Sequence, residues 1–478
     1  MRSAAIAVHP CATIAGVSSH RRARARLLAL GAALGVGLLV AGAGALAASA
    51  SLSQSPPTVG VVALATTTTG PPVTLAQQAL AGGATSATSA TSAPTTLDTS
   101  GIPGSTAVPT TVGTVAPGEF AAFDESLRSG LIGNGALAIS VAVAKDGKML
   151  HTAAFGVANP ASGEMASSAS RFRLASNSKL LTATAILELV EAGQLGLDEP
   201  VLARLATRLG VGFKDGRMAT VTLRQLLSHT SGMPEYDRTF FGGGAATCED
   251  AARRGLSSGL IGPPGTVYRY SNMNFCLLGL LVEDVTGKPY ATVVQDRVLH
   301  PLGIEDMRMA GTYDVQQGDV AHPTTPGRTF MEALAGAGAW IGTPTDLVRI
   351  VDGLDRSRPG WHPLSAATVT QMQAAQPGVA YHEGQWYGLG LRVWADGTWG
   401  HTGTVENARS MVIRRPDGIT WAVMVSGNTP SNTDRIRRYV DRAFATIGVA
   451  APPVTGAPPP APGPAPAPAP TVTAGAAP

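Results

Sequence analysis

A serine and a lysine, Ser176 and Lys179, stand three residues apart at the predicted start of a helix over residues 176–192. This spacing puts a hydroxyl and an amine on one face of a helix. A serine hydroxyl is a weak nucleophile that needs a base, and a lysine can be that base when burial or nearby cations lower its pKa. The helix N-terminus also offers backbone N–H groups and a partial positive charge to a developing oxyanion. The pair therefore indicates nucleophilic acyl transfer, although so short a motif also arises by chance.

Two further segments make this pair more specific. Tyr270-Ser271-Asn272 precedes an apolar helical stretch, and His401-Thr402-Gly403 lies between two predicted strands. With the three motifs in this order, the sequence resembles the serine β-lactamase and penicillin-binding-protein-like hydrolases, of the type close to class C β-lactamases, D-alanyl-D-alanine carboxypeptidases and related esterases. The resemblance covers roughly residues 117–449 and is supported by the stretches 193–200, 221–232, 300–303 and 335–346.

The resemblance implies a role for each residue of the first two motifs. Ser176 would be the nucleophile that forms an acyl-enzyme, and Lys179 would hold or share the role of base. Tyr270, kept partly ionised by Lys179, would pass the proton to the leaving group and later activate water. A tyrosine with its ordinary pKa of about 10 needs such cationic help. Asn272 would bind the substrate amide or orient Lys179.

The third motif is expected to border the substrate. The resemblance implies that His401 and Thr402 line the substrate side, and that the N–H groups of Ser176 and Thr404, the residue after Gly403, form the oxyanion hole. Many relatives carry lysine where this chain has His401, so recognition of a substrate carboxylate is expected to be weaker and pH-dependent. This departure favours esters or amides without a free carboxylate, while a β-lactam, a D-alanyl peptide and an ester all stay open as substrates.

Two other sequence features could indicate a catalytic residue, but we interpret both as structural. Residues 255–259 fit the G-x-S-x-G pattern, which requires a strand before it and a helix after it. Here a polar, helix-like stretch precedes the pattern and a proline-rich loop follows, so we interpret it as a surface loop. His229 is interpreted as a hydrogen-bonded loop residue rather than the base of a triad. The sequence has no H-E-x-x-H motif and no Cys/His cluster with metal-ligand spacing.

Two classes of function follow from these motifs. The first is an exported serine hydrolase that forms an acyl-enzyme on an amide, ester or peptide-like substrate, without a metal or an organic cofactor. The second is a non-catalytic or weakly turning-over penicillin-binding or sensing module at the cell envelope. The intact Ser176, Lys179 and Tyr270 favour the hydrolase, because a degenerate site is free to lose one of them. No sequence pattern specifies an oligomeric state.

The predicted elements would place these motifs between two lobes. Strands joined by tight turns pair antiparallel, so strands from both ends of the domain would form one sheet around an inserted helical region. The expected fold is of the α/β class (α+β type), β-lactamase-like and two-lobed, with helices flanking an antiparallel sheet and the site in the cleft. The expected elements are helices over 117–129 and 432–447, strands over 137–143, 149–157, 387–394, 410–414 and 419–425, and a largely helical region over 200–385.

Charged residues are distributed unevenly along the chain of 478 residues. Charged residues make up only 14% of it, but they concentrate in residues 117–449, which hold thirty basic and thirty-one acidic side chains. A nucleic-acid-binding domain needs a basic patch, so this balance weighs against one. The expected partner is a small-molecule or peptide-like substrate.

The two ends of the chain are predicted to lie outside the catalytic domain. Four arginines within 21–26 precede an apolar run over 27–48, so residues 1–50 read as a signal peptide or an uncleaved N-terminal membrane anchor. Either reading predicts an exported protein that is secreted, at the cell envelope, or anchored to the outer face of the membrane. Residues 51–116 and 450–478 are predicted to be a disordered spacer and a disordered Pro/Ala-rich tail.

Cysteines are few. Cys11 belongs to the leader, which leaves Cys248 and Cys276 in the predicted domain. Export favours a disulfide between them. Two buried free thiols are the alternative, because Cys276 stands in an apolar helical stretch.

Overall fold

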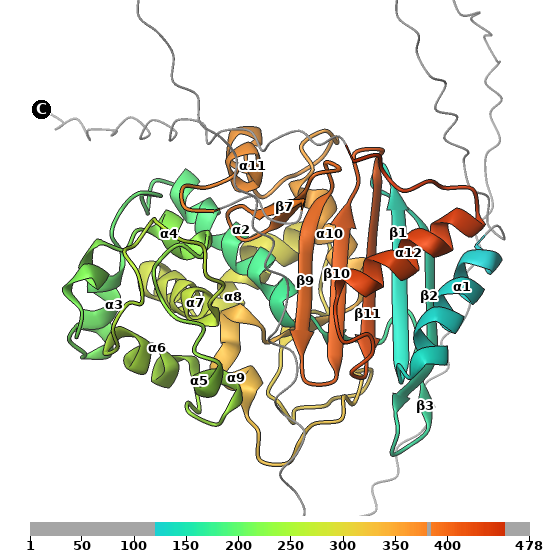
Figure 1. Ribbon diagram of the computed structural model, residues 1–478, viewed down its shortest axis with the longest axis horizontal. Coiled ribbons are helices and arrows are strands. Elements are labelled where there is room, and N and C mark those ends of the chain that lie inside the picture. The colour runs from blue at the N-terminus through green and yellow to red at the C-terminus, as the bar shows by residue number, and fades with distance from the viewer. Residues whose placement is uncertain (1–119, 380–383, 455–478) are drawn as a thin grey trace, which may run out of the picture. The chain divides into compact units, whose positions relative to one another are not determined.

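The computed structural model describes residues 120–379 and 384–454 (Figure 1). The predicted leader over 1–50, the spacer over 51–116 and most of the tail over 450–478 lie outside these residues. Within the described part of the chain, no helix has both the length and the apolar character needed to span a bilayer.

One antiparallel sheet of eight strands organises the domain, in the order β3-β2-β1-β11-β10-β9-β8-β7. Its centre joins the two ends of the domain, because β1 pairs with β11 and places Ala138 opposite Ser426. This arrangement confirms the predicted mixed fold with an antiparallel sheet. The strands are β1 Ala138–Lys145, β2 Lys148–Asn159, β3 Glu164–Met165, β7 Gln385–Tyr387, β8 Arg392–Trp394, β9 Trp399–Val405, β10 Ala408–Arg414 and β11 Ile419–Ser426.

Helices cover both faces of the sheet (Figure 1). Side chains alternate between the two faces of a strand. In β1, Ile139, Val141 and Val143 pack in the core formed with α1 (Ala121–Leu131) and α12 (Asp434–Thr446). Ala138 and Ala142 belong instead to the core that contains α10 (Pro344–Leu354) on the opposite face.

A mainly helical region adjoins the sheet, as expected from residues 200–385. A small sheet in the order β4-β6-β5 accompanies it, with strands Phe172–Arg173, Trp340–Gly342 and Arg308–Met309. The α-helices are α3 Leu202–Leu209, α4 Leu223–Leu227, α5 Asp237–Phe241, α6 Cys248–Leu256, α7 Asn272–Thr286, α8 Tyr290–Val294, α9 Phe330–Leu334 and α11 Ala366–Gln373. Short 3-10 or π turns lie at η1 Ile132–Asn134, η3 Gly216–Thr220, η4 Gln295–Leu299, η5 His300–Leu302 and η6 Ala335–Ala337.

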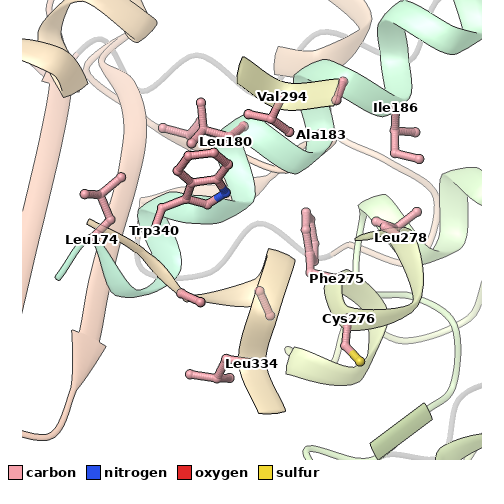
Figure 2. Close-up of a cluster of buried hydrophobic side chains, with 14 of the residues drawn as sticks. Leu174, Leu180, Ala183, Ile186, Phe275, Cys276, Leu278, Val294, Leu334 and Trp340 are labelled. Carbon is pink, nitrogen blue, oxygen red and sulfur yellow. The ribbon is translucent and has the colours of Figure 1, made fainter. Parts of the chain in front are cut away.

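Helix α2 (Ser178–Glu191) runs through the interior between the sheet and the helical region (Figure 2). Its side chains are buried almost all round, which is the pattern of a central helix rather than an amphipathic surface helix. Leu180, Ala183 and Ile186 pack in one cluster with Phe275 of α7 and Trp340 of β6. The helix therefore holds its first turn in a fixed place relative to both lobes.

The segment before α2 departs from the predicted helix over 176–192. A single 3-10 turn, η2 (Ala175–Asn177), carries Ser176, and the α-helix begins at Ser178. Ala175 has φ of 50°, a left-handed conformation that costs a residue with a Cβ roughly 1–2 kcal/mol. The chain thus turns sharply just before the serine.

The expected single strand over 387–394 is wrong. The structure has two short strands, β7 and β8, joined by a turn that contains Gly388 and Gly390. Gly390 has φ of 82°, and a Cβ on Gly388 would lie 2.0 Å from the carbonyl oxygen of Met372. The chain reverses here because glycine permits both the conformation and the close approach.

Candidate active site

Ser176 and Lys179 meet at the start of α2. The Nζ of Lys179 lies 3.2 Å from Oγ of Ser176, within hydrogen-bond distance. Ser176 is half-buried, whereas Lys179 is fully buried. Ser176, in the turn just before α2, is therefore partly accessible, and the amine of Lys179 is buried beside it.

Two carbonyl oxygens complete the surroundings of the lysine. Its Nζ donates to Oδ1 of Asn272 at 2.9 Å and to the backbone oxygen of Ala337 at 2.7 Å. Burial, followed by the positive charge of Arg392, lowers the pKa of Lys179 well below its usual 10.5. A neutral amine has two N–H donors and one lone pair. The two carbonyls take the donors, so the lone pair is left for the hydroxyl of Ser176.

Tyr270 lies beside this pair in the loop before α7. The Nζ of Lys179 stands 4.9 Å from the centre of its ring, and its hydroxyl hydrogen-bonds with Ser176. Burial nevertheless raises the pKa of Tyr270 well above its usual 10, although the bond with Ser176 and the charge of Arg392 lower it. The expectation that Lys179 keeps Tyr270 partly ionised is therefore wrong, because Lys179 itself favours its neutral form. Tyr270 stands as a protonated hydroxyl.

His401 in β9 is buried rather than presented to a substrate. Its Nε2 accepts a hydrogen bond from the hydroxyl of Tyr387 at 2.9 Å, and its Nδ1 lies 2.6 Å from the carbonyl oxygen of Thr402. The contact with a carbonyl oxygen places a proton on Nδ1, and in the neutral ring Nε2 is then the acceptor. Burial, then the charge of Arg392, lowers the pKa of His401 well below its usual 6.5. The expected pH-dependent contact of His401 with a carboxylate is thus wrong.

Strand β9 passes close to the nucleophile segment. A Cβ on Gly403 would lie 2.3 Å from the carbonyl oxygen of Leu174 and 3.1 Å from Cβ of Ala175. Only glycine allows this approach, which brings the backbone of residues 403–404 beside Ser176. Thr402 is buried and Thr404 is exposed.

His229 is held in a loop, in agreement with its structural interpretation. Its Nδ1 accepts from the backbone N–H of Ser271 at 3.2 Å, and its ring centre lies 4.3 Å from that of Tyr270. Burial lowers its pKa well below 6.5. The residue supports the loop that carries Tyr270.

Arg392 and Tyr387 also lie near the site, although no sequence motif contains them. Arg392 borders a cavity of about 510 Å³ whose other walls are mostly aromatic or apolar, and its Nε is buried without a partner among the described residues. Tyr387 lines the same cavity and binds His401. The sequence feature that could have indicated Arg392 is a single arginine in an apolar strand, nine residues before His401. The cavity is lined by Thr266, Val267, Tyr268, Gly378, Val379, Gln385, Trp386, Tyr387 and Arg392.

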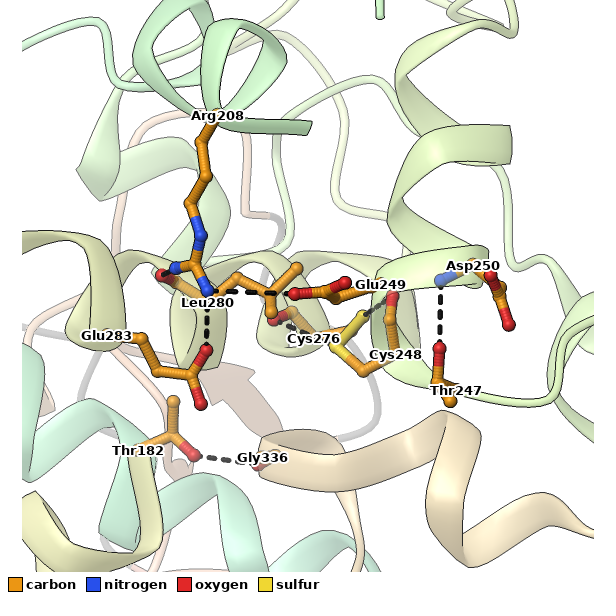
Figure 3. Close-up of a disulfide and its surroundings, with 10 residues drawn as sticks. All are labelled: Thr182, Arg208, Thr247, Cys248, Glu249, Asp250, Cys276, Leu280, Glu283 and Gly336. Atoms are coloured by element: carbon orange, nitrogen blue, oxygen red, sulfur yellow. Dashed lines mark hydrogen bonds and ion pairs between the residues drawn. A yellow bond between two sulfur atoms is a disulfide. The ribbon is translucent and has the colours of Figure 1, made fainter. Parts of the chain in front are cut away.

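A disulfide connects α6 with α7 (Figure 3). Cys248, the first residue of α6, is bonded to Cys276 with an S–S distance of 2.15 Å. Cys276 stands one helical turn after Asn272 in α7. The bond therefore joins α6 to the part of α7 that carries a contact of Lys179.

The rival G-x-S-x-G pattern begins in the last two residues of α6 and continues into a loop, so it lacks the strand that a nucleophile elbow requires. Among residues 120–379 and 384–454, no group of three or more His, Cys, Asp or Glu side chains is placed to hold a metal ion.

A serine lies 3.2 Å from a buried lysine at the start of a central helix beside an antiparallel sheet, and this arrangement defines a class of serine hydrolases. The Beta-lactamase family model matches residues 123–446, and the chain belongs to this family. The predicted family is thereby confirmed, and the protein is a serine hydrolase.

Relatives agree with this assignment. Esterase EstB of Burkholderia gladioli is 30% identical over 331 residues, which span 60% of this chain and 83% of EstB. Protein flp of Staphylococcus aureus (strain MW2) is 33% identical over 168 residues, about a third of its own length. A crystal structure of SurE with D-Leu is 26% identical with a TM-score of 0.54, covering 70% of this chain and 77% of that one. The octameric penicillin-binding protein homologue from Pyrococcus abyssi shares the fold at 22% identity, with a TM-score of 0.57 and coverage of 70% and 78%.

Proposed function

We propose that the protein hydrolyses an ester or amide through an acyl-enzyme on Ser176. The observation that carries this proposal is the buried Nζ of Lys179, which lies 3.2 Å from Oγ of Ser176 and contacts no carboxylate within residues 120–379 and 384–454. A carboxylate there would hold the lysine charged. Without one, the amine is free to act as a base at neutral pH.

The proposed reaction has two halves. Lys179 accepts the proton of Ser176 while Oγ attacks the substrate carbonyl, and the oxyanion binds the N–H groups of Ser176 and Thr404. The hydroxyl of Tyr270 relays the proton from Lys179 to the leaving group as the C–O or C–N bond breaks. Water then enters, loses its proton through the same groups, and releases the acid and free Ser176. Asn272 keeps Lys179 oriented throughout.

The cavity beside the site supports a substrate that carries both an apolar group and a carboxylate. Tyr268, Trp386 and Tyr387 offer aromatic surface, and Arg392 offers a cation whose Nε lacks a partner among the described residues. Guanidinium groups bind carboxylates with charge-assisted hydrogen bonds. Arg392 thus replaces the cation that His401 does not supply. The D-Leu in the SurE structure is a molecule with this combination of groups.

We also propose that the protein is exported through its N-terminal segment. The support is the arginine cluster followed by the apolar run over 27–48, together with a disulfide, which persists in oxidising compartments. The segment would be either a cleaved signal peptide or an anchor at the outer face of the membrane. Residues 51–116 would then be a spacer before a catalytic domain over 117–449, with a Pro/Ala-rich tail over 450–478.

The first experiment labels Ser176 and then measures turnover. A fluorophosphonate should label the wild-type protein and not Ser176→Ala; equal labelling of the two would overturn the assignment. A panel of p-nitrophenyl butyrate, nitrocefin and a D-Ala-D-Ala peptide then separates esterase, β-lactamase and carboxypeptidase activity. Labelling without turnover of any of the three would instead indicate a binding or sensing module.

A further inference from the structure

A buried serine of the sheet forms hydrogen bonds with residues on both sides of the nucleophile in the sequence. Ser410 lies in β10, is fully buried, and stands opposite Gly403 of β9. Its Oγ donates to the carbonyl oxygen of Leu174 at 2.6 Å and accepts a hydrogen bond from Nδ2 of Asn177 at 2.7 Å. One hydroxyl therefore binds the residues two before and one after Ser176.

The segment between these two bonds needs support. Ala175 has φ of 50°, which a residue with a Cβ adopts only when its surroundings enforce it. A serine hydroxyl can donate one hydrogen bond and accept others, so Ser410 satisfies a carbonyl and an amide at once. Alanine at position 410 would leave the carbonyl of Leu174 and the side-chain amide of Asn177 without this hydroxyl as a partner.

The geometry also connects this hydroxyl to strand β9. A Cβ on Gly403 would lie 2.2 Å from Oγ of Ser410 and 2.3 Å from the oxygen of Leu174. The strand, the serine hydroxyl and the nucleophile segment are thus in direct contact. The two N–H groups assigned to the oxyanion hole, those of Ser176 and Thr404, belong to the two backbones that meet here.

We propose that Ser410 is a positioning residue of the acyl-transfer reaction, which rests on the proposed function. By fixing Leu174 and Asn177, its hydroxyl sets the distance between the N–H groups of Ser176 and Thr404. Catalysis by oxyanion stabilisation depends on such fixed donors, and a displacement of about 1 Å can cost about 100-fold in rate. Ser410 touches neither the substrate nor the reacting atoms.

The test compares Ser410→Ala with a matched control, Ser140→Ala. Ser140 is also fully buried in the sheet, and its Oγ lies 3.3 Å from the carbonyl oxygen of Ala153 in β2, away from the nucleophile. Both variants lose one buried hydroxyl. The measurements are kcat/KM with p-nitrophenyl butyrate, the affinity of phenylboronic acid, whose adduct with Ser176 places an oxygen in the oxyanion hole, and amide exchange over residues 175–177.

We expect Ser410→Ala to lower kcat/KM and the boronic acid affinity by about tenfold to 100-fold each. Amide exchange over 175–177 should also become faster, while Ser140→Ala changes none of the three. Asn177→Leu, which removes only one of the two bonds, should give an intermediate loss, and it serves as the test variant if Ser410→Ala does not fold.

Two contrary outcomes are distinguishable. If the wild-type protein neither reacts with a fluorophosphonate at Ser176 nor binds the boronic acid, the proposed function is wrong and the role of Ser410 falls with it. If the wild-type protein reacts, and Ser410→Ala matches Ser140→Ala in rate, affinity and exchange, only the role of Ser410 is overturned.

Discussion

The hydroxyl of Tyr387 donates a hydrogen bond of 2.9 Å to Nε2 of His401, and both side chains are buried. This bond, with the contact of Nδ1 to the carbonyl oxygen of Thr402, leaves the histidine no free nitrogen. His401, which was expected to border the substrate, is thus a buried residue held by the side chain of Tyr387 and the backbone of Thr402.

Tyr387→Phe should destabilise the protein by about 1–3 kcal/mol, because it leaves the buried Nε2 of His401 without a donor. Urea unfolding measures the loss. Tyr439→Phe on α12 is the matched control, since its hydroxyl has no hydrogen bond to the described residues. Equal stability of Tyr387→Phe and the wild-type protein would show that the bond contributes nothing.

The lowered pKa of Lys179 should determine the acid limb of the plot of kcat/KM against pH. The neutral amine is the base, and it exists above this pKa, so kcat/KM for an uncharged ester should fall as the pH drops through it. Arg392→Gln removes a charge that lowers the pKa, and the acid limb should therefore move to higher pH. Arg128→Gln, an exposed change on α1, should leave the profile in place. A shift to lower pH in Arg392→Gln would contradict the assignment of Lys179 as the base.

Arg392 should discriminate between substrates by charge. With two aryl esters that differ only in a carboxylate on the leaving group, Arg392→Gln should lower kcat/KM for the carboxylate ester by about 10- to 100-fold, as expected for a lost charge-assisted hydrogen bond. The uncharged ester should change by less than about threefold at a pH above the acid limb. Equal losses for both esters would mean that the arginine does not bind the carboxylate.

The disulfide should stabilise the domain. Cys248 and Cys276 are 28 residues apart, and a closed loop of that size corresponds to roughly 3–4 kcal/mol in the chain-entropy model. Dithiothreitol should therefore lower the melting temperature of the wild-type protein. It should not affect Cys248→Ser/Cys276→Ser, which already lacks the bond. An unchanged melting temperature under full reduction would contradict this account.

Local patterns predicted the family, the fold class and the residues around Lys179, because Ser-x-x-Lys and Tyr-x-Asn are short motifs whose chemistry is visible in sequence. The boundaries of α2 were less accessible, since the 3-10 turn at Ser176 is enforced by contacts with the sheet. Burial and the charge of Arg392 lower the pKa of His401, and its hydrogen bond with Tyr387, fourteen residues away, holds the ring in place. Neither feature could be predicted from the His-Thr-Gly motif.

Contacts between residues far apart in the chain could not be predicted from the sequence. Ser410 follows Asn177 by 233 residues, and nothing in an apolar strand marks one buried serine as a support of the nucleophile. The pKa directions of Lys179 and Tyr270 likewise depend on burial, which the motif spacing does not give. These features come from tertiary packing rather than from local preference.

The pairing of β1 with β11 also bears on how the chain acquires its structure. The first long strand obtains its central partner only when residues 419–426 have been synthesised, nearly 300 residues later. Until then the β1–β2 hairpin has an open edge, and open strand edges are sites of aggregation. Such non-local pairing also slows folding. A nascent chain of this protein therefore cannot complete its central sheet until almost the whole domain has been synthesised.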